Sequence, residues 1–163
     1  MNTLIDVFRS LDGRRGEFIV YDDGYRVRRH SYTDVTRAAR GFAAGLAAAG
    51  LRQGDKILLW SENRPEWIVA YWGAVISGVI VVPIDFRSSA EFVARVRDIV
   101  DGRIIFSGDD HAYAASPQLA NVAQASEGGR LPFETRPLAG VDWAADGPMP
   151  AVSVDRDDVA QIV

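Results

Sequence analysis

The sequence predicts an α/β fold, in which a parallel sheet is covered by helices on both faces and is preceded by a β-hairpin. Two observations lead to this class. From Lys56 to Ser107 the pattern runs strand, helix, strand, helix, strand, which is typical of successive right-handed βαβ units. The strand segments in this range are also continuous apolar runs, as expected where both faces of a parallel sheet are buried.

The composition fits one soluble globular domain. The chain has 163 residues, of which 48% are hydrophobic and 25% charged, and a chain of this length can bury a core. A net charge of −4 argues against a nucleic-acid partner, because such domains carry a basic excess. The sequence contains no cysteine, which excludes disulfides and thiolate zinc sites and is compatible with a reducing, cytoplasmic setting. Residues 1–8 lack the basic start and long apolar run of a signal peptide.

The hairpin is expected over residues 17–32. Two runs rich in aromatic and β-branched residues, Phe18–Tyr21 and Tyr25–Tyr32, flank Asp22-Asp23-Gly24, which suits a tight turn. Basic side chains alternate with apolar ones in the second run, so we expect them on the solvent face of that strand. These are Arg26, Arg28, Arg29 and His30, and anion binding is the alternative for them.

The βαβ core is expected over residues 33–108 and begins with an amphipathic helix. Thr33 is predicted to cap this helix and Gly50 to end it. Within the helix, Gly41 and Gly45 are four residues apart, and we expect them to allow close packing on the sheet. A buried strand is predicted over Lys56–Trp60.

The next helix has almost no polar face. Pro65 is placed in its first turn, and Trp67, Tyr71 and Trp72 are expected in the core rather than in a ligand site. Because residues 67–84 carry no charge, peripheral membrane contact is the alternative. We favour a helix followed by a strand at Val79–Val82, because the second half of the stretch is β-branched.

A third helix and a further strand complete the core. Ser88 and Glu91 match a capping box, and Phe92, Val96 and Ile99 mark the expected apolar side. The helix is predicted to end at Asp101-Gly102, and Ile104–Phe106 to form the next strand.

Beyond the core the pattern weakens. Residues 109–150 are rich in proline and glycine and are predicted to be irregular, with a short helix near 117–125. Residues 151–163 lead into an apolar strand that stops in mid-course, so we expect the chain to be the incomplete amino-terminal part of a longer protein.

Motifs for catalysis or metal binding are absent. The sequence has no Walker loop, no dinucleotide fingerprint and no nucleophile elbow, so no catalytic residue is assigned. His30 and His111 have no neighbours at metal-ligand spacing and are expected at the surface. Asp101 with Asp109 and Asp110 could bind a cation, but adjacent acids after a strand are more typical of a solvated turn; no metal site is predicted.

One junction is a candidate binding site. Residues 83–88 connect the carboxyl end of a predicted parallel strand to the start of a helix, where open α/β sheets bind ligands and helix amides favour anions. Phe86, Arg87 and Ser88 are the candidate residues, with Arg87 placed to meet a phosphate. The alternative is that Asp85 and Arg87 only stabilise the turn.

Four segments occur in the order of a known family. Ser31-Tyr32-Thr33-Asp34-Val35 is similar to that family's Thr-Tyr-x-Glu-Leu, and Gly50–Ile57 to its Gly-Val-x-x-Gly-Asp-x-Val. Ser61–Trp67 is similar to its Asn-x-x-Glu-Trp, and Gly73–Asp85 to its helix-to-strand stretch that ends in Val-Pro-Ile/Leu-Asp. In this order they resemble the amino-terminal region of adenylate-forming acyl-CoA synthetases, the AMP-binding ligase superfamily.

This resemblance implies a two-step ligase that uses ATP, Mg²⁺ and CoA. A fatty or other carboxylic acid would attack the α-phosphate of ATP, pyrophosphate would leave, and the CoA thiol would displace AMP. The family's catalytic residues would lie beyond Val163, so this chain alone is expected to be inactive and to need the remainder of its own chain. Phe86, Arg87 and Ser88 would lie near the CoA nucleotide, and the lack of the Gly-Gly pair of acetyl-CoA synthetases points away from acetate. A stand-alone binding or assembly module, such as a homo-oligomer, is the alternative.

Overall fold

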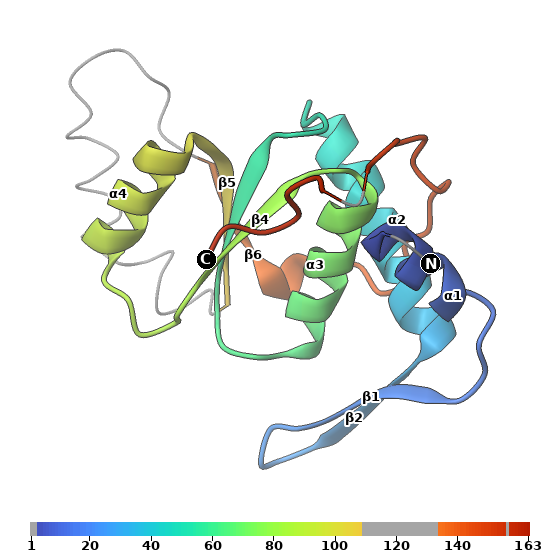
Figure 1. Cartoon of the computed structure of the whole chain (residues 1–163). Helices are drawn as coiled ribbons and strands as arrows, with labels where there is room; N and C mark the ends of the chain where they lie inside the picture. Colours follow the sequence, from blue (N-terminus) through green and yellow to red (C-terminus); the bar gives the residue numbers. More distant parts are fainter. Residues whose placement is uncertain (1–2, 109–133, 156) are drawn as a thin grey trace.

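The computed structural model describes residues 3–108, 134–155 and 157–163. Its central sheet is parallel, in the order β4-β3-β5-β6, and a separate antiparallel pair, β1-β2, projects from it as a hairpin (Figure 1). The strands are β1 (Glu17–Asp22), β2 (Val27–Ser31), β3 (Lys56–Trp60), β4 (Ile80–Ile84), β5 (Gly102–Ser107) and β6 (Glu134–Pro137). The helices are α1 (Leu4–Leu11), α2 (Tyr32–Ala48), α3 (Pro65–Ile76) and α4 (Ala90–Val100), with a 3-10 turn η1 (Leu138–Gly140).

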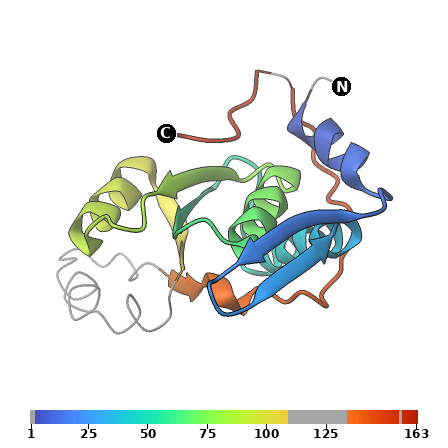
Figure 2. The same ribbon diagram turned by 90° about the horizontal axis from the view of Figure 1, so that it is seen from below.

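Both faces of the parallel sheet are covered, which confirms the predicted fold class. Because side chains alternate along a strand, Ile57 and Leu59 of β3 pack into the core shared with α2 and α3. Leu58 and Trp60 belong to the opposite core, which includes Val93 of α4. Figures 1 and 2 show α2 and α3 on one side of the sheet and α4 on the other.

The uncharged stretch divides into a helix and a strand, as predicted. Pro65 is the first residue of α3, and β4 follows after the turn at Ser77 and Gly78. None of the helices in the described part of the chain is long and apolar enough to span a bilayer. Trp67 and Tyr71 are partly buried against the core under α3, so their expected packing role is confirmed.

Helix α1 was not predicted. It is amphipathic: Thr3 accepts a hydrogen bond from the Asp6 amide, the Asp6 carboxylate accepts one from the Thr3 amide, and Ile5, Phe8 and Leu11 are buried. Phe8 packs 5.6 Å from Trp72 of α3, measured between ring centroids. The capping pair Thr3 and Asp6, with apolar residues every third position, was the available sequence signal.

The predicted caps of two helices are wrong. Ser31, not Thr33, caps α2, because its backbone is still extended and its hydroxyl accepts from the Asp34 amide at 3.1 Å while Asp34 accepts from the Ser31 amide at 2.9 Å. Ser89, not Ser88, caps α4 through the Phe92 amide. Helix α2 therefore begins earlier than predicted, at Tyr32, and α4 begins later than predicted, at Ala90.

The predicted buried side of α4 is also wrong in part. Ala90, Val93 and Ala94 are buried against the sheet, whereas Phe92 and Ile99 are exposed at 46% and 77%. Two small alanines allow α4 to lie close to the sheet, so the larger apolar residues of the neighbouring helical stripe face outward.

The range expected to be irregular contains regular structure. Strand β6 runs parallel to β5, with Ile105 opposite Thr135 and Phe106 opposite Arg136, and η1 follows it. The helix expected near 117–125 lies outside the described residues.

Residues 160–162 lie beside the outer edge of β4. The Val81 amide donates to the Ala160 carbonyl and the Ile162 amide to the Val81 carbonyl, each at 3.0 Å, and Gln161 forms a parallel bridge with Val81. The terminal strand expected from the sequence is therefore present only as this short parallel pairing.

Candidate functional site

Three parallel strands end together and define one edge of the sheet. Trp60 at the end of β3 is paired with Ile84 of β4 and with Ser107 of β5. The connections to α3 and α4 leave from this edge, so both helix amino termini belong to it. Ligands of open α/β sheets bind at such a carboxyl edge, and we take it as the candidate site.

Asp85 and Arg87 form a closed pair in the loop between β4 and α4. Asp85 accepts a hydrogen bond from the Arg87 amide at 2.8 Å, and its two carboxylate oxygens accept from the guanidinium at 3.1 and 2.9 Å. The guanidinium hydrogen bond, with the Arg87 amide second, holds the pKa of Asp85 at about 2. The same pair raises the pKa of Arg87.

The structure brings the three predicted site residues together on this exposed loop. The guanidinium carbon of Arg87 lies 5.8 Å from the centre of the Phe86 ring, and the Ser88 amide donates to the Asp85 carbonyl at 3.0 Å. The side chain of Arg87 is 75% exposed. An anion at this loop would therefore compete with the Asp85 carboxylate for a guanidinium that is already oriented.

A buried carboxylate near the same edge was missed by the sequence analysis. Glu66, only 5% exposed, lies in the first turn of α3, 3.1 Å from a guanidinium nitrogen of Arg28 and 3.3 Å from one of Arg64. Arg64 also donates a hydrogen bond to the carbonyl oxygen of Gly108, just after β5. Buried charges of this kind require such pairing, and these contacts tie the hairpin, α3 and the end of β5 together.

The prediction that Arg28 and His30 lie on the solvent face of the hairpin is therefore wrong. Arg28 points toward Glu66, and the His30 ring stacks on Trp143 with 3.8 Å between ring centres. Burial lowers the pKa of His30. Three consecutive residues, 28 to 30, cannot share one face of a strand, and Val27 and Arg29 are the exposed residues here. Glu66, the partner of Arg28, lies 38 residues away in sequence.

The described residues include no group of three histidine or acidic side chains that could hold a metal ion. Asp101 ends α4 in the left-handed conformation. His111, Asp109 and Asp110 lie outside the described residues.

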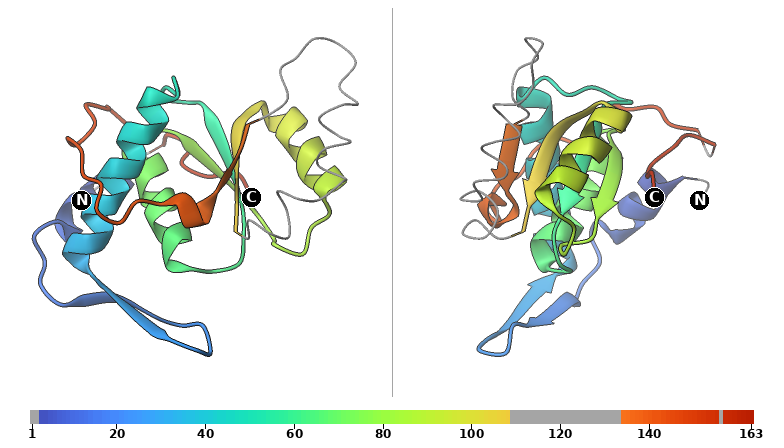
Figure 3. Two further views of the ribbon diagram at one scale, coloured as in Figure 1. Left: turned by 180° about the vertical axis from the view of Figure 1, so that it is seen from behind. Right: turned by 90° about the vertical axis from the view of Figure 1, so that its left-hand side faces the viewer.

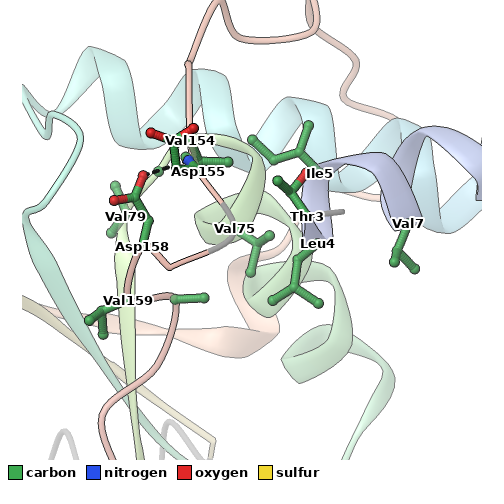
Figure 4. Close-up of a pocket in the computed structure, with 12 residues that line it drawn as sticks. Thr3, Leu4, Ile5, Val7, Val75, Val79, Val154, Asp155, Asp158 and Val159 are labelled. Atoms are coloured by element: carbon green, nitrogen blue, oxygen red, sulfur yellow. Dashed lines mark hydrogen bonds between the residues drawn. The ribbon is translucent and has the colours of Figure 1, made fainter. Parts of the chain in front are cut away.

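A cavity of about 380 Å³ lies away from this edge, between α1 and residues 154–155 and 158–160. Figure 4 shows aliphatic side chains of α1 on one side and Asp155 and Asp158 on the other, where the Asp155 amide donates to the Asp158 carboxylate at 2.8 Å. Two carboxylates at its rim make this cavity unsuitable for a phosphate group.

A family model described as "AMP-binding enzyme" matches residues 8–163. Among curated proteins, 106 residues are 31% identical to a 3-[(3aS,4S,7aS)-7a-methyl-1,5-dioxo-octahydro-1H-inden-4-yl]propanoyl:CoA ligase of Mycobacterium tuberculosis, which is 60% of this chain and 21% of that protein. The chain is also 34% identical over 87 residues to a long-chain-fatty-acid–CoA ligase of Mycobacterium bovis. This match covers 50% of this chain and 14% of that protein. The matches thus span only a small part of the relatives' length.

The fold also matches solved structures. The N-terminal domain of FACL13 from Mycobacterium tuberculosis superimposes with a TM-score of 0.78 at 22% identity, over 99% of this chain and 41% of that one.

Proposed function

This chain belongs to the AMP-binding enzyme family, and we propose that it forms the amino-terminal region of an ATP-dependent acyl-CoA ligase. In the first step a substrate carboxylate attacks the α-phosphorus of ATP, which forms an acyl-adenylate and releases pyrophosphate. In the second, the CoA thiol attacks the acyl carbon, forms the thioester and releases AMP with the thiol proton. The observation that carries the proposal is the family match over residues 8–163.

The acid is proposed to be a medium- or long-chain fatty acid. One relative is named for a long-chain fatty acid and another for a bicyclic propanoic acid, so the family match alone leaves several acids open. The loop sequence Asp85-Phe86-Arg87-Ser88 differs from the Gly-Gly loop of acetate-specific enzymes, which favours a larger acid.

The loop after β4 is proposed to contact the CoA nucleotide. A guanidinium suits a phosphate group because it offers paired N–H donors, and the half-exposed Phe86 ring offers a surface for adenine. Arg87 would then exchange the Asp85 carboxylate for a phosphate. Ser88 adds a hydroxyl to the same loop.

ATP and its Mg²⁺ are assigned to no described residue. Mg²⁺ would neutralise the phosphates of ATP when the nucleotide binds, but the described residues offer no group of three candidate ligands for it. We also propose that the 163-residue chain alone is inactive, because it has no glycine-rich loop to cradle phosphates, and that the protein acts in the cytoplasm.

The test is ATP–pyrophosphate exchange with short, long and aromatic acids, run in parallel on the 163-residue chain and on the product of its extended reading frame. Acid-dependent exchange in the extended protein alone is the expected result. Exchange in neither, with every acid of the panel, would reject acid activation and favour a binding module. Exchange by the 163-residue chain would reject its proposed inactivity.

A further inference from the structure

A second apolar cavity lies on the other side of the molecule, between α2 and the segment that follows β6. Its volume is about 290 Å³. Phe42 and Leu46 of α2, Phe106 of β5 and Val141 after η1 form its walls. Figure 3 shows the orange and red segment after β6 running past α2. Its lining includes Phe106 and Pro137 near the ends of β5 and β6 but no residue of the Asp85–Arg87 loop.

Two glycines of α2 line this cavity but differ in their surroundings. A Cβ atom on Gly41 would lie 2.5 Å from the Cβ of Ala145, so the neighbouring segment requires a glycine there. Gly41 therefore packs against Ala145 after η1, and the prediction that it packs on the sheet is wrong. A Cβ atom on Gly45 would meet no atom within 4 Å. Glycine is a poor helix former, and packing within the described protein gives no reason for it at position 45.

Gly45 is exposed and lines the cavity, so the open space at this position is where the cavity opens to solvent. An apolar cavity of about 150 Å³ can hold benzene, and this one has nearly twice that volume. The rings of Phe42 and Phe106 are 4.9 Å apart and tilted by 50°, an arrangement that a third ring can extend by edge-to-face contact. The space suits one aromatic ring with a short substituent.

The charges at the cavity favour an uncharged ligand. Arg136 and Asp142 both line it, so their opposite charges select neither an anion nor a cation. A hydroxyl group can donate to a carboxylate and accept from a guanidinium. We propose that this cavity binds a small, uncharged aromatic compound that carries a hydroxyl group, with Gly45 leaving the open side of the cavity unobstructed.

The proposal is tested with 4-propylphenol on the 163-residue chain, using methyl-labelled NMR samples. We expect saturable shifts at the methyl groups of Leu46 and Val141, with a dissociation constant below about 1 mM. Nuclear Overhauser contacts between the probe ring and the Leu46 methyls should place it in the cavity, and this measurement needs no variant. Gly45→Leu, which fills the space, should weaken binding by at least about tenfold. Ala47→Leu changes an exposed position of the same helix that does not line the cavity, and it should leave binding unchanged.

Three results would overturn the proposal. The first is no saturation up to the solubility limit of the probe. The second is saturable shifts confined to Leu4, Val75 and Val79, which would place the probe in the cavity beside α1. The third is equal binding by the wild type and Gly45→Leu. The experiment contains no ATP, acid or CoA, so its outcome is independent of the ligase activity.

Discussion

Arg28 in β2, the second strand of the hairpin, and Glu66 at the start of α3 are 3.1 Å apart, and Glu66 is only 5% exposed. The pair joins the antiparallel hairpin to the parallel domain. Arg64 adds a second cation beside Glu66 and a hydrogen bond to the Gly108 carbonyl. The Glu66 carboxylate and the two arginines therefore connect the hairpin, the start of α3 and the end of β5.

Glu66→Ala should destabilise the protein by about 2–4 kcal/mol, because it leaves two arginines without their buried partner. The side chain of Arg28 is 37% exposed, so the loss should lie toward the lower end of that range. Urea denaturation measures it. Glu17→Ala, which breaks an exposed pair with Arg29, is the matched control and should cost under about 1 kcal/mol. Equal effects of the two substitutions would contradict a special role for Glu66.

The sequence predicted the elements better than it predicted their orientation. β3 was predicted over its observed range because Ile57–Trp60 are all apolar and Lys56 follows a turn signal. The inward direction of Arg28 could not be predicted, because it depends on Glu66, which is distant in sequence. Strand β6 has four residues and ends in a proline, so only its pairing with β5 identifies it.

The candidate site shows the same division. Residues 83–88 were predicted to connect a strand end to a helix start, and Phe86, Arg87 and Ser88 do share that loop. The bidentate contact of Arg87 with Asp85 depends on side-chain conformations, which residue spacing does not fix. A local sequence pattern can therefore locate this loop, but the ion pair between Asp85 and Arg87 can be identified only from the three-dimensional structure.

Arg87→Ala should raise the pKa of Asp85 from about 2 toward its ordinary value of 3.8. Because the folded pKa is depressed, the pair contributes to stability above pH 3.8, and the contribution is lost as the pH falls through about 2. Carbon-13 NMR of the Asp85 carboxyl group measures the pKa. The pKa of Asp85 should not return fully to 3.8, because the backbone amide of residue 87 still donates a hydrogen bond to the carboxylate. Arg95→Ala, an exposed substitution on α4, should leave the titration unchanged.

In the ligase that contains this chain, Arg87→Ala should raise the KM for CoA by about tenfold, as expected for the loss of one charge-assisted hydrogen bond. Acid-dependent ATP–pyrophosphate exchange should not change, because CoA takes no part in it. Asp85→Asn removes the competing charge and keeps Arg87, so it should not raise the KM. An unchanged KM for CoA in Arg87→Ala would remove this loop from the CoA site.

Gly41→Ala and Gly45→Ala should change stability in opposite directions, although the same residue is exchanged in the same helix. At position 45 the new methyl group meets no atom within 4 Å, so the better helix propensity of alanine should stabilise the protein by about 0.5–1 kcal/mol. At position 41 the methyl group would lie 2.5 Å from the Ala145 Cβ, and overpacking should cost about 1–3 kcal/mol. Thermal unfolding of the two variants beside the wild type measures both effects. Stabilisation by both substitutions would show that residues 141–147 move away from α2 at little cost, since only a displacement of Ala145 can make room at Gly41.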